Sequence, residues 1–336
     1  MASRFALGVA LVSASLMLYL FLPSLIPVFR VSPGAVVLDE GTSAVLSISS
    51  RNVFYSPETG RYWALYRSWA TGDLVYRSSP DGVNWDPPVV VVPATEHKRG
   101  GTWWPDGSRV HLAFRGADDN TYYQCGTMTS GGTITWGPRY KVGPFVFDYA
   151  PLVCVSGEYV WVVCQTYDAV ELHVSRSGGT WETLNTFAFG EAIETSASSK
   201  PICPLGDGRV ALVTEISGNP AWFRIVSPSG VETEESVELP DLDCAWNYCV
   251  VYASGAFFLG YPGRDAVNQE HVVRILKRGA GGWSTVYEKR APYGVFGGSP
   301  SYSSILTSFS MTVLPDGELV VFYMRNFVSA LGFEKL

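Results

Sequence analysis

The chain has 336 residues, of which 47% are hydrophobic and 16% charged, so it can bury a large core and is not intrinsically disordered. The net charge is −7 and no basic stripe is present, which argues against nucleic-acid binding because phosphate neutralisation needs clustered Lys and Arg. Its 34 glycines, 21 prolines, 11 tryptophans and 18 tyrosines favour short strands and tight turns over long helices.

The N-terminal segment is strongly apolar. Residues 5–29 carry no charged side chain and are flanked by Arg4 and Arg30, and roughly 20 apolar residues suffice to cross a bilayer as a helix. Pro23 and Pro27 would kink or end that helix in its second half. Because no A-x-A-like cleavage site follows, residues 1–30 are predicted to be an uncleaved signal anchor. The rest of the chain would then face the extracytoplasmic side of the cell membrane, with a cleaved signal peptide and a secreted protein as the alternative.

After residue 31, a turn signature recurs about every 50 residues, each time with strand-like runs beside it. Runs such as 62–66, 159–163 and 319–323 are rich in β-branched and aromatic residues. Strands that repeat at this period without helices are typical of propeller blades. The glycines of the six turns are Gly60, Gly107, Gly157, Gly208, Gly255 and Gly317.

A second turn element follows each of the first five turns. Four of its five copies combine glycine and Trp, three of these also carry Ser, and the fourth copy along the chain lacks the Trp. Glycine supplies a positive φ, Ser or Asp bonds the local backbone, and Trp packs over the turn, so a structural turn between the two outer strands of a blade is predicted. The copies span residues 79–85, 130–136, 175–181, 227–230 and 278–283.

The last repeat begins near Ser301 and is short of an outer strand. Strand-like runs at 35–38 and 44–47 precede the first repeat, so an N-terminal strand is expected to complete the sixth blade and to remove an exposed sheet edge. The sequence therefore predicts an all-β fold, a six-bladed β-propeller over residues 31–336, preceded by the transmembrane signal anchor over residues 1–30. It specifies no oligomeric state.

Metal binding and cofactors are not expected. The six cysteines form no C-x-x-C pair, and the four histidines do not cluster with them. Cys154 and Cys164 could face each other across a hairpin as a disulfide, with free buried cysteines as the alternative.

The second turn element resembles the Asp box, S-x-D-x-G-x-x-W, of sialidases and related propellers. Its best copy, residues 78–85, keeps the Ser, Gly and Trp spacing and carries Asp81 one place late. The resemblance implies a sialidase-like propeller and a carbohydrate or glycoconjugate partner. Because propellers of different activities share the box, the activity depends on the site residues.

The resemblance also implies catalytic residues. Asp73, in the loop before the first box, matches the family's acid/base Asp. Glu194, or alternatively Glu191, matches the Glu that activates the nucleophile. Tyr302, in residues 301–305, matches the nucleophilic Tyr. A phenol needs such a carboxylate as base, and an Asp protonates the leaving oxygen. Each residue also has a structural alternative: a turn residue for Asp73, solvated loop charges for the two glutamates, and strand packing for Tyr302.

The substrate-binding candidates are arginines, since a planar guanidinium matches a carboxylate bidentately. Arg51 stands at the family's first arginine, and Arg67 and Arg264 complete the candidate set. Glu215 lies where a second arginine is expected and would repel a carboxylate, so the substrate of an active enzyme need not be a sialic acid. Two hypotheses follow: a membrane-anchored sialidase-like glycoside hydrolase, and a non-catalytic surface propeller that binds glycans or proteins.

Overall fold

The computed structural model describes residues 53–68, 70–144, 150–166, 169–188, 202–215, 221–239, 244–245, 248–265, 267–292, 309–313, 319–324 and 331–335. The chain divides into two units, residues 1–38 and 39–336, and all of these ranges belong to the second. Every regular element within them is a strand, and none of them contains a helix of the length and apolarity needed to cross a membrane. The predicted anchor over residues 1–30 lies outside the described residues.

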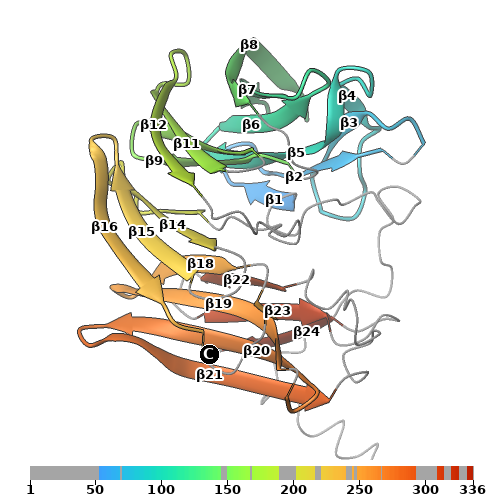
Figure 1. Cartoon of the computed structure of the whole chain (residues 1–336). Coiled ribbons are helices and arrows are strands. Elements are labelled where there is room, and N and C mark those ends of the chain that lie inside the picture. The colour runs from blue at the N-terminus through green and yellow to red at the C-terminus, as the bar shows by residue number, and fades with distance from the viewer. Residues whose placement is uncertain are drawn as a thin grey trace, which may run out of the picture. The chain divides into compact units, whose positions relative to one another are not determined.

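Six antiparallel sheets follow one another along the chain (Figure 1). In sheets 1 to 4, strands that are consecutive in sequence are neighbours in the sheet. Sheet 1 contains β1 (Val53–Ser56), β2 (Arg61–Arg67), β3 (Leu74–Ser79) and β4 (Val89–Val92), and sheet 2 contains β5 (His97–Asp106), β6 (Arg109–Gly116), β7 (Asn120–Met128) and β8 (Ile134–Pro144). Sheet 3 contains β9 (Leu152–Ser156), β10 (Tyr159–Gln165), β11 (Ala169–Arg176) and β12 (Glu182–Ala188), and sheet 4 contains β13 (Ile202–Pro204), β14 (Val210–Glu215), β15 (Ala221–Ser227) and β16 (Gly230–Val237).

The last two sheets depart from this four-stranded plan. In sheet 5, two short strands, β17 (Cys244–Ala245) and β18 (Cys249–Ala253), both pair with β19 (Ala256–Asp265), which is followed by β20 (Glu270–Gly279) and β21 (Gly282–Pro292). Sheet 6 shows three strands among the described residues, namely β22 (Phe309–Val313), β23 (Leu319–Met324) and β24 (Leu331–Lys335). The N-terminal strand expected to complete this sheet lies outside the described residues, so that closure stays a prediction.

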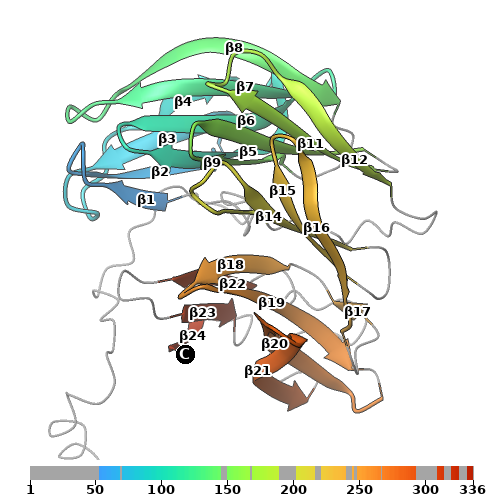
Figure 2. The ribbon, with the colours of Figure 1, turned by 90° about the vertical axis from the view of Figure 1, so that its left-hand side faces the viewer.

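Apolar clusters join each sheet to the next one in chain order. Each of five clusters draws its buried side chains from two consecutive sheets, and Figure 2 shows the strands of sheets 1 and 2 running side by side. Such face-to-face packing of antiparallel sheets in series is the packing of propeller blades, and the all-β prediction is confirmed. Representative pairs, from sheets 1 and 2 through to sheets 5 and 6, are Trp63 and Trp103, Tyr123 and Val162, Leu172 and Val210, Phe223 and Leu259, and Ile275 and Met311.

The predicted first turn of each repeat joins the first and second strands of a sheet. The turn glycines have φ values between 57° and 95°, a region that L side chains rarely adopt. The hairpin prediction is confirmed for Gly60, Gly107, Gly157, Gly208 and Gly255, while Gly317 lies outside the described residues.

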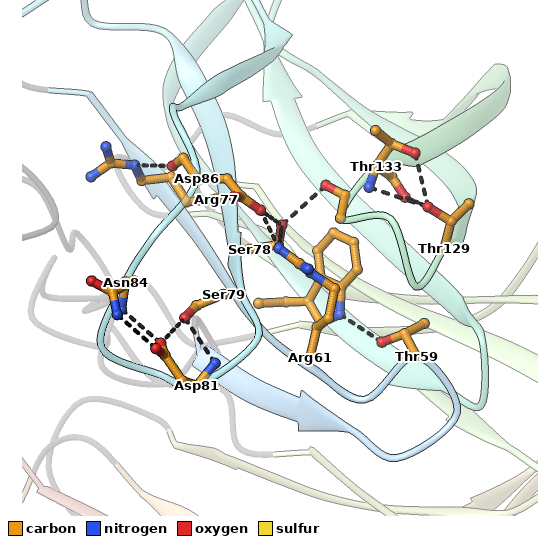
Figure 3. A network of polar contacts seen from close by, with 12 residues as sticks. Thr59, Arg61, Arg77, Ser78, Ser79, Asp81, Asn84, Asp86, Thr129 and Thr133 are labelled. Atoms are coloured by element: carbon orange, nitrogen blue, oxygen red, sulfur yellow. Dashed lines mark hydrogen bonds and ion pairs between the residues drawn. The ribbon is translucent and has the colours of Figure 1, made fainter.

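The second turn element joins the third and fourth strands, as predicted. In residues 79–85 (Figure 3), Ser79 Oγ accepts a bond from the Gly82 N–H at 2.9 Å, and Asp81 Oδ1 accepts one from the Asn84 N–H at 2.7 Å. The Trp85 indole donates to the Gly82 carbonyl at 3.2 Å. Backbone N–H donors, that of Asn84 foremost, hold the pKa of Asp81 well below its usual value. The side chains of this turn are thus engaged in shaping it.

In later copies the Trp reaches the preceding sheet. Trp181, before β12, makes an edge-on contact with Tyr123 of sheet 2 at 4.9 Å between ring centroids, and Trp283 of β21 makes one with Phe223 of sheet 4 at 5.2 Å. The expectation that each Trp packs over its own turn is therefore incomplete, since these two also bind neighbouring sheets to each other.

The suggested pairing of Cys154 with Cys164 is wrong. Cys154 lies opposite Trp161 across the β9–β10 hairpin. Cys164 is three residues further along β10, so its side chain points to the other face of the sheet. Cys154 accordingly packs between sheets 3 and 4, and Cys164 packs between sheets 2 and 3.

Candidate functional site

The two ends of each sheet differ in what they carry. At one end, here called the turn end, lie the turns between first and second strands and between third and fourth strands. At the other, the connection end, the second strand leads into the third and one sheet leads into the next. Of the predicted site residues, Arg67 is the last residue of β2 and Asp73 precedes β3, which places both at the connection end of sheet 1.

The β2–β3 connection is a closed loop. The Ser68 N–H donates to the Asp73 carbonyl at 2.7 Å, and the Gly72 N–H donates to the Ser68 carbonyl at 2.9 Å. Arg67 Nε donates to the Gly72 carbonyl at 3.1 Å. The guanidinium of Arg67 is therefore held against its own loop.

Asp73 ties this loop to the segment that leads into sheet 2. Its Oδ1 accepts a bond from the Ala94 N–H at 2.7 Å. The Thr71 hydroxyl and then the Ala94 N–H hold the pKa of Asp73 below its usual value. A general acid must carry a proton near the working pH, so these contacts favour the alternative interpretation of Asp73 as a turn residue.

His97 opens β5 beside this loop and was not singled out from the sequence. The residue is only 5% exposed. Neither ring nitrogen has a partner of good hydrogen-bond geometry among the described residues. Burial and then the charge of Arg67 lower the pKa of His97, while the nearby Gly72 backbone and Asp73 act in the opposite direction. The imidazole is thus neutral at ordinary pH.

A cluster of three charged side chains lies at the connection end of sheet 2. Lys98 Nζ lies 2.8 Å from both carboxylate oxygens of Asp119, and Arg115 Nε donates to Asp119 Oδ1 at 2.9 Å. Lys98 and then Arg115 hold the pKa of Asp119 below its usual value. Asp119 has a φ of 61° in the β6–β7 turn, a conformation that Asp tolerates better than most residues. No motif marks these residues in the sequence.

Of the remaining predicted residues, Arg264 is the one that the structure describes, and it belongs to a different sheet. The backbone of Arg264 pairs with Cys244 and His271 near the connection end of sheet 5. Arg51, Glu191, Glu194 and Tyr302 lie outside the described residues. Within the described ranges, no group of three or more His, Cys, Asp or Glu side chains could hold a metal ion.

Comparison with known proteins finds similar folds and no relative by sequence. No family model matches the sequence, and no curated protein matches it. Solved structures do match: the NanB sialidase of Streptococcus pneumoniae has a TM-score of 0.54 at 10% identity over 90% of this chain and 69% of its own. The α-L-arabinanase of Penicillium chrysogenum, complexed with arabinobiose, has a TM-score of 0.51 at 12% identity over 89% of this chain and 96% of its own. AofleA of Arthrobotrys oligospora has a TM-score of 0.53 at 11% identity over 89% and 92%.

These neighbours define the class of fold. Serially packed antiparallel sheets, together with the likeness to a sialidase and an arabinanase, show a β-propeller fold similar to that of these two proteins. At such low identity the likeness extends to the fold alone, and function has to be argued from the site.

Proposed function

We propose that this chain is a glycan-binding propeller whose ligand meets the connection end of the sheets. The observation that carries the proposal is the shared fold with a sialidase and with an arabinanase that holds arabinobiose. The groups at this end support it, because Arg, Asp and Lys side chains of sheets 1 and 2 supply donors and acceptors of the kind that bind sugar hydroxyls. Loops that converge on one end of a propeller also commonly form concave sites.

The contacts of Asp73 favour binding over catalysis. Its carboxylate is stabilised in the ionised form by Thr71 and Ala94, whereas protonation of a glycosidic oxygen needs a carboxyl group with a raised pKa. On this proposal Asp73 shapes the loop at the site and presents a fixed acceptor.

A second candidate function is a sialidase-like glycoside hydrolase. In that version Asp73 is the acid/base, Glu194 or Glu191 activates Tyr302 as nucleophile, and Arg51, Arg67 and Arg264 hold the substrate. Its support is positional, since Asp73 lies at a connection end and the segments with Glu194 and Tyr302 lie between β12 and β13 and between β21 and β22.

The proposal extends to the architecture of the whole chain. We propose that residues 31–336 form six blades, with an N-terminal strand in the last, that the outer turns are degenerate Asp boxes, and that residues 1–30 anchor the propeller on the extracytoplasmic side of a membrane. The three strands of sheet 6 beside the four-stranded plan of sheets 1 to 4 support the first point, and the bonding of residues 79–85 supports the second. The anchor rests on the uncharged run 5–29.

The decisive experiment measures binding and hydrolysis with the same preparation. The full chain is titrated with a panel of oligosaccharides and is incubated with aryl glycosides, with Tyr302→Phe as the matched variant. Binding without hydrolysis supports the glycan-binding proposal. Hydrolysis that Tyr302→Phe abolishes supports the hydrolase instead, and the absence of binding to any sugar contradicts both.

A further inference from the structure

We infer that the connection end of sheets 1 and 2 takes an uncharged sugar and rejects a sugar carboxylate, an inference that rests on the glycan-binding function proposed above. The argument concerns the three cationic side chains described there, Arg67, Lys98 and Arg115. A site that recognises a carboxylate needs guanidinium groups with donors that are not already engaged.

Arg115 is already committed within the protein. Its side chain is only 8% exposed and is paired with Asp119. Turning it to a ligand would leave the Asp119 carboxylate without one of its two cationic partners, and breaking an ion pair of which one member is buried is costly. Arg115 therefore has little capacity to bind an anion.

Lys98 shares the same carboxylate. Both Asp119 oxygens lie 2.8 Å from Lys98 Nζ, so one aspartate stands between two cations. A carboxylate on a ligand at this position would meet the negative charge of Asp119, whose side chain is 42% exposed. The pair of cations thus attracts an anion much less than two unpaired cations would.

At sheet 1 the balance is similar. Arg67 bonds to the Gly72 carbonyl, and the ionised Asp73 follows Gly72 in the same loop. His97 beside them is buried and neutral, so it adds no positive charge. The same end also carries the carboxylate of Asp118, and that of Glu96, which pairs with Arg139. Charges of both signs therefore lie together there, which suits hydroxyl groups that both donate and accept hydrogen bonds.

The test uses two sugars that differ by one charged residue. The full chain is titrated with lactose and 3′-sialyllactose, together with neutral arabinobiose, at low and at high NaCl concentration. We expect a neutral sugar to bind with an affinity that salt changes by less than about twofold, and sialyllactose to bind no more tightly than lactose. Binding of sialyllactose more than about tenfold tighter than lactose, lost at high salt, would overturn the inference and leave the glycan-binding proposal standing. Absence of binding to every sugar would overturn both.

A matched pair of variants tests the role of Asp119. Asp119→Asn releases Lys98 and Arg115 and is expected to raise the affinity for sialyllactose by roughly fivefold, without a gain for lactose. Asp118→Asn removes the same charge from the same turn, yet Asp118 bonds to Asn120 and Tyr122, so no gain is expected. Equal behaviour of the two variants would show that Asp119 does not neutralise the site. If Asp119→Asn fails to fold, the inference is tested by the salt dependence of sialyllactose binding to the wild-type protein.

Discussion

The turn end of sheets 3 and 4 and the connection end of sheets 1 and 2 are held by different kinds of contact. At the turn end of sheets 3 and 4, Ser156 Oγ donates to the Arg209 carbonyl at 2.6 Å, and the Trp161 indole donates to the Gly208 carbonyl at 3.2 Å. At the connection end of sheets 1 and 2, charged side chains pair with each other and with loop backbone. A bond from a side chain to the backbone of the next sheet holds only at one relative position of the two sheets. Charged side chains at the surface can instead be replaced by other residues without moving the sheets. The bonds to backbone therefore act as a scaffold between sheets 3 and 4, whereas the charged contacts of sheets 1 and 2 lie where the proposed ligand would bind.

The largest expected effect comes from breaking the scaffold at Trp161. This side chain is fully buried and bonds to the next sheet, so Trp161→Ala should lower the free energy of unfolding by about 3–5 kcal/mol. Urea denaturation followed by circular dichroism measures the change. Trp161→Phe, which keeps a ring and loses the indole N–H, should cost clearly less; an equal cost would show that packing volume does not dominate at this position.

A smaller loss is expected from Gly157. Its φ is +57°, and a Cβ there would lie 3.0 Å from the Gly208 N of the next sheet, so Gly157→Ala combines left-handed strain with a close approach to backbone and should cost about 2 kcal/mol. Gly60 has a φ of +65° with no atom within 4 Å, and Gly60→Ala should cost about 1 kcal/mol from strain alone. The difference in melting temperature between the two variants isolates the contact between sheets, and no difference would contradict it.

Acid should weaken the connection end of sheet 5 in a defined range. Asn268 and then Arg290 lower the pKa of Asp265 from 3.8 to about 2. Because the folded-state pKa is depressed, this stabilisation is fully present above pH 3.8 and is lost as the pH falls through about 2. Melting temperatures of wild type and Asp265→Asn should thus differ at pH 6 and converge as the pH falls below 3.8. A gap that stays constant down to pH 2.5 would refute the assignment.

The smallest effect on folding is expected from Asp73. Asp73→Asn keeps an oxygen that can accept the Ala94 N–H bond, so the melting temperature should shift by no more than the equivalent of about 1 kcal/mol. Neutral sugar binding should stay within about threefold of wild type, since the loop is preserved. Isothermal titration measures it. Loss of a hydrolytic activity in this variant, with binding retained, would instead favour the catalytic role.

The parts of the molecule that could be predicted from the sequence are those with local causes. The turns at Gly60, Gly107 and residues 79–85 were predictable because glycine, Ser and Asp act on backbone a few residues away. The partner of Asp73, the Ala94 N–H, has no side-chain signal at all. Lys98 and Asp119 meet because a turn reverses the chain between them, and nothing in either local sequence marks the pair.

The suggested Cys154–Cys164 disulfide failed for a related reason, whereas the alternative of two buried cysteines agrees with the structure. Whether Cys154 and Cys164 can meet depends on strand register, and a shift of one residue moves a side chain to the opposite face of a sheet. Composition and turn spacing fixed the hairpin but not this register. Conversely, six repeated turns were enough to predict the all-β fold that the described residues have, because each repeat carries the same local turn and strand signals.

The reach of Trp181 and Trp283 onto the preceding sheet has a consequence for the order in which the molecule is made. During synthesis, sheets 3 and 5 leave the ribosome after sheets 2 and 4, on which these tryptophans rest, so the docking surface of each tryptophan is already present. Sequential folding of this kind resembles that of repeat proteins, in which every unit contacts only its neighbours. Domains also generally begin to fold from the N-terminal side during synthesis. If an N-terminal strand completes sheet 6, as proposed above, that closing step alone would have to wait for the C-terminal sheet.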